Sequence, residues 1–470
     1  MSTLFPFFLA PPEGLYSAIL AVFLGLGALF VTLIARRHGG GAGVIAVVHS
    51  AGGVLALLAQ DLMSLLIGWE LLSFSAFLLI RRRGTRNNRK IAYRYIATQV
   101  TAAVLFFTAA VVQWWHSGSL LITVLVPQAQ WPILLAVMIK TASMPVHQWL
   151  IQSYPMTDPL VTPLLSVFTT KVGVITAARL VQLNPAGVPI VAWIGAITAL
   201  VAVIYALQQQ NPRRLLSYHI VSQVGYMVAG IGLGAATAGL FHLVTHTLYK
   251  GLLILVAAEA IRLNRHEDLS RMRPLRFRRP ILLASAVVGA AAISGVPFTS
   301  GFASKYLLKE AAAAVPGIQW LLLFASVGTG LSFIKFVFLI FFHSPSGKDA
   351  TPNADGPDLW VGWVMSGIAI ATIYIGILPN TIPGVPAVAF FTPAAIVAAL
   401  QPLAGSVLLW FLLRGYLTHP HGKLTAKIMP LQHRMVAMIK PPVRNLHEVG
   451  PQLQVFVILL AFMIVVALLR

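Results

Sequence analysis

The chain has no cysteine among its 470 residues, which excludes disulfides, thiolate catalysis and iron–sulfur ligation by this chain. It is also poor in charge, because only 10% of its residues are charged and only 12 of them are acidic. A soluble domain carries roughly 25% charged residues, so a soluble globular protein is excluded as well. The first apolar run, 16–35, lacks a basic stretch before it and a small-residue cleavage site after it. We therefore interpret it as a retained helix rather than a signal peptide.

Long apolar runs are what the sequence does contain, and hydrophobic residues make up 58% of it. The runs are far longer than barrel strands, and backbone in lipid must satisfy its own hydrogen bonds, so we predict an all-α polytopic membrane protein. At ~20 residues per span, about fourteen transmembrane helices are expected. Their predicted ranges are 16–35, 43–60, 61–81, 91–115, 131–153, 163–183, 188–208, 215–234, 235–262, 282–313, 319–343, 360–378, 393–414 and 453–469.

The charge that is present is mostly positive, with 33 Lys and Arg residues and a net charge of +21. Nucleic-acid binding is one interpretation of such basicity. However, the cations gather between apolar runs, which is the usual orientation signal of a membrane protein, and no nucleic-acid partner is expected. The clusters at 36–37, 81–90, 213–214 and 262–279 all follow odd-numbered spans. The positive-inside rule therefore predicts that these loops are cytoplasmic and that the N-terminus lies outside.

The run 282–313 is long enough for two spans or for one span interrupted at Ser294–Gly301. Two spans would move the basic segment Arg414–Arg444 to the outside, against the other clusters, so we expect one broken helix. Pro145 predicts a second break, within 131–153, because proline removes a backbone donor. Two broken helices in corresponding places are typical of transporters built from inverted repeats. The predicted organisation is an N-terminal helix (1–42), two inverted five-helix repeats (43–183 and 188–343) and C-terminal helices (344–470) with a basic cytoplasmic segment (414–444).

Lys140 lies inside the apolar run 131–153 with no carboxylate nearby in sequence. An ammonium at membrane depth costs at least about 2.5–3.5 kcal/mol, so it is expected mainly where it has a function. Glu70 is the carboxylate that lies well inside an otherwise apolar span, and a pair with Lys140 would keep both groups charged. Ion or proton movement is one interpretation of this pair, and a structural salt bridge between two helices is the other.

His242, His246 and Lys250 follow one another at i, i+4 and i+8, so they share one face of a helix. A proton relay, ordinary interhelical hydrogen bonding and a metal site are three interpretations. No neighbouring Cys, Asp or Glu completes a metal site, and no metal is expected. His147 follows the first break, where it either bonds freed carbonyls or lines a water-filled half-channel. Further titratable residues in or beside apolar runs are Lys171, His219, Lys305 and Lys335.

Several of these residues lie in segments that resemble one family. The chain resembles the antiporter-like proton-translocating subunits of respiratory complex I and of multisubunit (Mrp-type) cation/proton antiporters, most of all the D-type subunit. The resemblance extends over about 43–343 and rests on ordered motifs. These are Gly68–Ser73, Ile139–Leu150, Thr170–Val174, Arg214–Tyr226, Phe241–Leu253 and Gly295–Lys305.

The resemblance implies a relay along the middle of the membrane. Glu70 and Lys140 would form a switchable ion pair, and Lys305 would be the terminal residue. Between them the resemblance implies relay roles for Lys171, His242, His246 and Lys250, while His147, His219 and Lys335 are weaker candidates. Compared with the family, the N-terminus looks two helices shorter, and the long lateral helix of one complex I subunit is not evident.

The expected function is proton translocation, with or without cation antiport, by a subunit of a larger complex in a bacterial or archaeal cytoplasmic membrane. No chemical active site or cofactor is expected in this chain. Expected partners are other membrane subunits, the lipid bilayer and a cytoplasmic protein that docks on the basic loops. One alternative is the proton-driven membrane subunit of an inorganic-carbon uptake complex with a zinc-containing cytoplasmic partner. A standalone sodium/proton antiporter is another.

Overall fold

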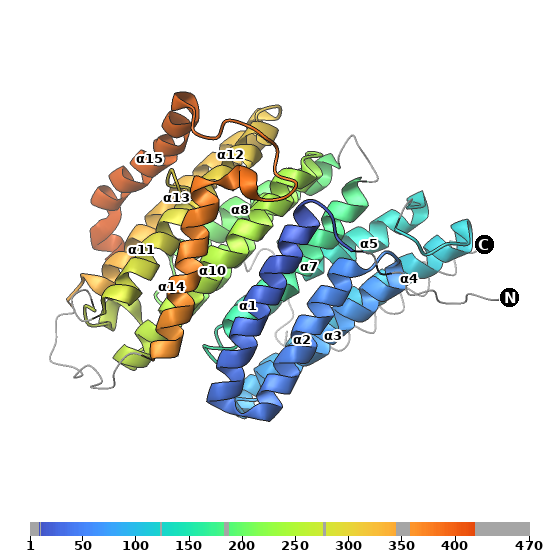
Figure 1. Cartoon of the computed structure of the whole chain (residues 1–470), viewed down its shortest axis with the longest axis horizontal. Coiled ribbons are helices and arrows are strands. Elements are labelled where there is room, and N and C mark those ends of the chain that lie inside the picture. The colour runs from blue at the N-terminus through green and yellow to red at the C-terminus, as the bar shows by residue number, and fades with distance from the viewer. Residues whose placement is uncertain are drawn as a thin grey trace, which may run out of the picture.

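The computed structural model describes Leu9 and residues 11–122, 125–182, 188–275, 279–344 and 358–418. Apart from two isolated bridges, the regular structure of these residues is helical, and long helices run side by side (Figure 1). The prediction of an all-α protein is confirmed. The predicted span 453–469 and the part of the basic segment after Thr418, with Lys423, Lys427, Arg434 and Lys440, lie outside the described residues.

Ten described helices are long and apolar enough to cross a membrane by length and composition. They are α1 (Leu15–His38), α2 (Gly40–Leu58), α3 (Leu62–Arg81), α4 (Arg86–Ser117), α7 (Thr162–Gln182), α8 (Pro189–Leu207), α10 (Ala236–Asn264), α13 (Pro316–Phe341), α14 (Leu359–Ile377) and α15 (Pro393–Thr418). The 21-residue helix α9 (Pro212–Gly232) is almost entirely buried. Two broken pairs complete the described spans: α5 (Pro127–Lys140) with α6 (Gln148–Ser153), and α11 (Pro280–Ser294) with α12 (Ser300–Ala312). The short 3₁₀ helices η1 (Leu269–Arg271) and η2 (Pro379–Thr381) lie in loops.

Helix α10 occupies the middle of the bundle. It contacts α7, α9, α11, α12 and α14, and Figure 1 shows it between α7 and the pair α11 and α14. Every residue in the most apolar eighteen-residue stretch of this helix is buried, so the stretch contacts protein on all sides rather than lipid. Polar side chains on α10 therefore lie in the protein interior, where they can interact with several helices at once.

Two helices begin earlier than predicted because polar residues cap them. The α4 helix begins at Arg86 rather than at 91, since the Thr85 hydroxyl accepts a hydrogen bond from the Asn88 amide at 3.1 Å. The α9 helix begins at Pro212 rather than at 215, because the Asn211 side chain accepts hydrogen bonds from the backbone amides of Arg213 and Arg214. N-caps of this kind stabilise the first turn of a helix. In both cases that turn contains arginine, so apolar periodicity alone does not locate it.

Both predicted breaks are present, and residues with positive φ mark them. The first lies between Lys140 and Gln148, where Ala142 has a φ of 54°. The second follows Ser294, where Gly295 has a φ of 80°. A left-handed residue ends an α-helix because it cannot continue the right-handed backbone geometry.

Gly301 allows the two half-helices of the second break to approach each other. A Cβ atom on this residue would lie only 1.7 Å from the Ala292 carbonyl oxygen. We expect Gly301→Val to prevent stable assembly, with a cost of at least about 4 kcal/mol, because backbone would have to move away from backbone. The yield of folded protein in membranes and its Tm measure this effect. Gly367→Val is the matched control, since nothing lies within 4 Å of that position; equal yields for the two variants would contradict the expectation.

The two halves of the predicted repeat show parallel contacts. The α2 and α3 helices approach at Gly52 and Gly68, where a Cβ on Gly68 would lie 2.9 Å from the Gly52 oxygen. The α8 and α9 helices approach in the same way at Gly195 and Gly225, where the corresponding distance is 2.7 Å. These parallels support two repeats of similar construction, and their inverted relation stays a prediction.

A cation from the last helix of each half caps the first helix of that half. Arg179 on α7 donates to the Ala59 carbonyl at the end of α2, at 2.6 Å, and also to the Leu57 carbonyl. Lys335 on α13 donates to the Leu207 and Gln209 carbonyls at the end of α8, at 2.9 and 2.8 Å. Positive groups are favourable at helix C-termini. In these contacts Arg179 on α7 therefore corresponds to Lys335 on α13.

Lys335→Ala is expected to lower the free energy of unfolding by about 1–3 kcal/mol, because two buried carbonyls lose a charged donor. Lys335→Arg keeps a donor and the charge, and it should retain most of the stability. The Tm of each purified variant in detergent or nanodiscs measures the difference. An alanine variant as stable as the wild type would show that the cap contributes nothing.

The loops that were predicted to be cytoplasmic meet at one end of the bundle. Arg82 donates to the His38 carbonyl at 3.0 Å, which joins the loop after α3 to the end of α1. Arg213 donates to the Tyr154 carbonyl at 3.0 Å, which joins the start of α9 to the segment after α6. Further bonds here are Arg83 to Met156 (3.4 Å), Asn211 to Glu267 (3.0 Å) and the Leu269 amide to Gln210 (2.8 Å). The basic loops therefore share one end, and its cytoplasmic location stays a prediction.

Candidate functional site

Lys140 is held by neutral groups on α3. Its side chain is 1% exposed, and its Nζ donates to the Ser73 hydroxyl at 2.9 Å and to the Trp69 carbonyl at 3.2 Å. The ammonium also lies 5.0 Å from the centroid of the Trp69 ring. The ion pairs among the described residues do not include Glu70 with Lys140. The predicted pair is therefore not a direct contact here, although both of these partners lie on the same helix as Glu70.

Glu70 is half-buried, and it lies at the edge of the bundle. Its Oε1 atom has no hydrogen-bond partner among the residues that the structure describes. The carboxylate lines a groove of about 420 Å³ between α2 and α3, with apolar neighbours such as Val44 and Phe74. Glu70 and Lys140 still interact electrostatically through space. Glu70 thus lines an apolar groove and interacts with Lys140 without a direct contact.

His49 on α2 belongs to this end of the site, and the sequence analysis missed it. The side chain is fully buried, and its Nδ1 lies 2.9 Å from the Ser75 hydroxyl on α3. Its ring packs edge-on against Phe168, with the centroids 5.8 Å apart. The only signal in the sequence is a lone histidine within an apolar run, which does not distinguish a relay residue from a core histidine.

Lys171 and Lys250 are fully buried amines at the centre of the molecule. Lys171 lies in the middle of α7, and Lys250 lies on α10 with its Nζ 5.8 Å from the centroid of the Phe333 ring. Neither ammonium has a hydrogen-bond partner within the described ranges. The two charges act on each other, and both act on His246. The structure therefore brings these predicted residues together in the interior.

His242 links α10 to its neighbours through neutral groups. Its Nδ1 lies 2.9 Å from the Ser304 hydroxyl on α12, and its Nε2 lies 3.2 Å from Gln223 Oε1 on α9. The Tyr249 hydroxyl lies 3.4 Å from both Gln223 Oε1 and His242 Nε2. Interhelical hydrogen bonding therefore accounts for His242.

His246 differs from His242, because neither of its ring nitrogens has a hydrogen-bond partner among the described residues. Its ring packs edge-on against Tyr249 at 5.4 Å between centroids. In the part of the chain that the structure describes, no group of three or more His, Asp or Glu residues is arranged to hold a metal. Interhelical hydrogen bonding does not explain this second histidine, which leaves it available to exchange protons.

Lys305 lies beside the second break. Its Nζ donates to the Ile293 carbonyl at 2.8 Å, near the end of α11, and lies 5.2 Å from the centroid of the Tyr226 ring. The side chain is 5% exposed. Lys140 and Lys305 thus occupy similar surroundings, since each lies next to a broken helix and each bonds to neutral oxygen atoms.

The weaker candidates divide into three cases. His219 is fully buried against Phe333, with 4.8 Å between the ring centroids, and neither of its ring nitrogens has a described hydrogen-bond partner. His147 lies immediately before α6, and its Nε2 lies 3.2 Å from the side-chain Nε2 of Gln148, a contact that does not distinguish between its two interpretations. Lys335 caps α8 and contacts backbone carbonyls rather than the central groups. Of these three residues, only His219 lies among the central titratable groups.

The arrangement is a series of buried lysine and imidazole groups that extends from Lys140 at the end of α5 to Lys305 on α12. Burying an ammonium without a counter-ion is costly, so intramembrane lysines usually mark ion pathways. Imidazole can accept or release a proton near neutral pH. Like charges repel strongly in a low-dielectric interior, so a proton on one amine disfavours a proton on its neighbour. Such a series can pass protons along its length.

Comparison with known proteins identifies similar membrane subunits. The family model described as "NADH:quinone oxidoreductase/Mrp antiporter, TM" matches residues 59–332. NADH-quinone oxidoreductase subunit L of Pseudomonas aeruginosa is 30% identical over 393 residues, which are 78% of this chain and 63% of that protein. Subunit L of Escherichia coli is 28% identical over 402 residues, or 78% and 65% of the two chains. This chain therefore spans less than two thirds of the length of these relatives.

Solved structures show the same fold at lower sequence identity. A chain of the Mrp complex from Dietzia sp. has a TM-score of 0.69 and 23% identity, covering 84% of this chain and 83% of that one. A chain of respiratory complex I from Thermus thermophilus has a TM-score of 0.70 and 24% identity, covering 80% and 87%. At these identities the likeness establishes the fold alone, that of a polytopic membrane subunit.

Proposed function

Because the chain belongs to the NADH:quinone oxidoreductase/Mrp antiporter family of membrane subunits, we propose that it translocates protons as part of a larger membrane complex. The proposed relay begins at Glu70 and Lys140 and ends at Lys305. The groups between these ends are Lys171, His246, Lys250, His219 and His242. Other membrane subunits are the proposed partners, and the machinery that drives translocation belongs to them.

One observation carries this proposal: the four lysines of the proposed relay, Lys140, Lys171, Lys250 and Lys305, are at most 5% exposed, and none forms an ion pair with a carboxylate among the described residues. A purely structural role does not account for Lys171 and Lys250, because their ammonium groups bond to nothing that the structure describes. Apolar residues of similar volume would stabilise the fold at least as well. A requirement for titratable amines at these positions explains their presence.

The geometry at Lys140 suits a switch. Its ammonium bonds to the Trp69 carbonyl and the Ser73 hydroxyl, which are neutral and belong to adjacent turns of the helix that carries Glu70. A proton on Glu70 removes the attraction of the carboxylate, and loss of that proton restores it. In the proposed mechanism this change shifts Lys140 between a state that holds its proton and a state that passes it towards Lys171.

The orientation and the repeats belong to the same proposal. We assign residues 43–183 and 188–343 to two inverted repeats, and parallel helix contacts and helix caps support this assignment. The end with the basic loops faces the cytoplasm, which leaves the N-terminus outside. An acidic cytoplasmic partner would be attracted to these loops.

The experiment that tests the proposed function is purification of the complex from native membranes through a tag on this chain. Mass spectrometry identifies the partners, and the intact complex and the isolated chain are then reconstituted into vesicles with a pH-sensitive dye. We expect further membrane subunits to co-purify and only the intact complex to translocate protons. Sodium/proton exchange by the isolated chain, or no proton movement by the active complex, would contradict the proposal.

A further inference from the structure

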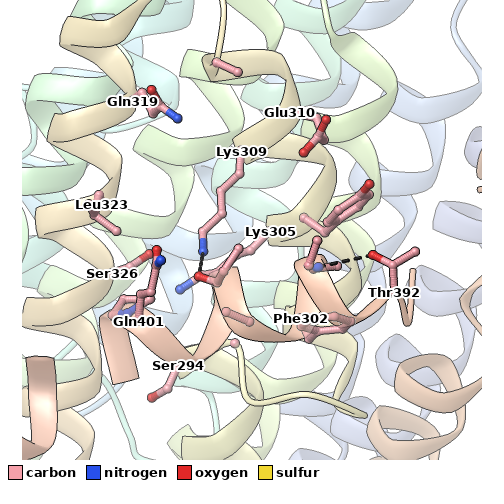
Figure 2. A pocket seen from close by; sticks show the side chains of 18 of the residues that line it. Ser294, Phe302, Lys305, Lys309, Glu310, Gln319, Leu323, Ser326, Thr392 and Gln401 are labelled. Carbon is pink, nitrogen blue, oxygen red and sulfur yellow. Dashed lines mark hydrogen bonds between the residues drawn. The ribbon is translucent and has the colours of Figure 1, made fainter. Parts of the chain in front are cut away.

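A cavity of about 470 Å³ lies where α12, α13 and α15 meet (Figure 2). Lys305 and Lys309 enter it from α12, and both point towards the side on which Ser326 and Gln401 lie. One water occupies roughly 30 Å³ in the liquid, so the cavity has room for on the order of ten waters. Its lining mixes apolar side chains with polar ones, and the polar side chains can hydrogen-bond water.

Lys309 is a second amine on the Lys305 face of α12. The two lysines are spaced i, i+4, which places one above the other on the helix. Lys309 is half-buried, and its Nζ donates to the Ala398 carbonyl on α15 at 2.9 Å. Its neighbour Glu310 is exposed and also lines the cavity. Exposure therefore increases in steps from Lys305 to Lys309 and then to Glu310.

The charged groups that line this cavity in the described part of the chain are Lys305, Lys309 and Glu310. The surrounding helices contribute neutral polar groups to the lining, namely Ser294, Gln319, Ser326, Thr392 and Gln401. The two ammonium groups share one cavity without a carboxylate between them. A proton on either amine therefore disfavours a proton on the other, which promotes alternate rather than simultaneous occupancy.

The cavity lies towards the end of the bundle opposite the basic loops. Gly317, close to Gln319 at the start of α13, packs against Trp193 near the start of α8. The start of α8 in turn bonds to the end of α9 through the Val188 amide and the Gly232 carbonyl, at 2.9 Å. Since α9 begins among the basic loops, this is the other face of the molecule.

We propose that Lys309 is a second proton-carrying amine in series with Lys305, which passes protons between Lys305 and the aqueous face at Glu310. The inference rests on the proposed function and extends its relay by one residue. The Lys305 ammonium gives a proton through cavity water to the neutral Lys309 amine. The Lys309 ammonium then releases that proton to water at the mouth beside Glu310, so each transfer conserves protons and charge. The Ala398 carbonyl holds Lys309 in its charged state.

The test compares Lys309 variants in the intact complex, reconstituted into vesicles that report proton translocation. Lys309→Met should slow translocation at least about 10²-fold, the lower end of the effects for positioned proton carriers. Lys309→Arg separates a relay from a structural role, because arginine keeps the charge and a donor for Ala398 but does not release a proton. We expect Lys309→Arg to be as slow as Lys309→Met, whereas a merely structural lysine would be rescued by arginine.

Chemical rescue provides a second measurement. Methylamine supplied on the cavity side should restore part of the translocation by Lys309→Ala, because the cavity has room for a small amine. Suppose that Lys305→Ala is inactive. A wild-type translocation rate in Lys309→Met or in Lys309→Arg would then overturn the inference. Wild-type rates in Lys305→Ala would instead overturn the proposed relay itself, so the two failures are distinguishable. Subunit content on a native gel confirms that each variant is assembled.

Discussion

Lys140→Ala abolishes coupled proton translocation in the proposed mechanism, whereas the complex still assembles. The change removes the amine beside Glu70, and loss of a positioned proton carrier reduces a rate by about 10²–10⁴-fold. The fold should tolerate it, because the partners of Lys140 are neutral. The Ser73 hydroxyl already donates to the Trp69 carbonyl at 2.7 Å, so these two groups keep a hydrogen bond when the amine is removed. Dye-reported proton translocation per assembled complex in vesicles measures the effect.

Lys140→Arg and Ser73→Ala are the controls for this expectation. Arginine keeps the positive charge but does not release its proton, so Lys140→Arg should also be inactive. Ser73→Ala removes one hydroxyl that contacts Lys140 and leaves the Trp69 carbonyl in place. It should therefore retain most of the rate. An assembled Lys140→Ala complex that translocates protons as fast as the wild type would contradict the relay.

Lys250→Met should abolish proton translocation without lowering the Tm, whereas Lys335→Ala should lower the Tm without abolishing translocation. Lys250 is fully buried and its ammonium has no hydrogen-bond partner among the described residues, so the exchange for methionine breaks no bond that the structure shows. Replacing a buried charge by an apolar side chain of similar length is often neutral or stabilising. We expect normal subunit content, a Tm at or above that of the wild type, and no translocation.

The control for this prediction is a lysine in a structural role. Lys335 is also fully buried, but it donates to two carbonyls at the end of α8. Its loss should lower the Tm, while translocation per assembled complex is retained. A large loss of Tm in Lys250→Met would show that this amine has a structural partner and that its burial is no sign of function.

Most of the helical architecture can be predicted from local sequence, because a long apolar run in lipid has no alternative to a helix. The two breaks can also be predicted, since Pro145 and the Gly-Val-Pro sequence after Ser294 interrupt helices by their own backbone chemistry. The ends of α4 and α9 are less predictable. Their first turns contain arginine, and the caps at Thr85 and Asn211 define where they begin.

Much of the site depends on packing, which sequence patterns do not determine. Lys140 contacts Ser73 and the Trp69 carbonyl rather than Glu70 because helix rotation places those oxygens nearer. His49 carries no spacing signal at all. The role of Lys335 depends on where α8 ends. In the sequence, Lys309 next to Glu310 is typical of a solvated helix end. Only the structure shows that Lys309 shares a cavity with Lys305.

The most direct test of the central claim is proton translocation by vesicles that contain the intact complex with Lys250→Met. This residue lies in the middle of the proposed series, so protons that pass from one end to the other are expected to pass through it. The measurement compares dye-reported proton translocation at equal amounts of assembled complex, for the variant and the wild type. The relay predicts that the variant loses translocation while it remains folded and assembled. Wild-type translocation by the assembled variant would contradict a proton path through the buried lysines.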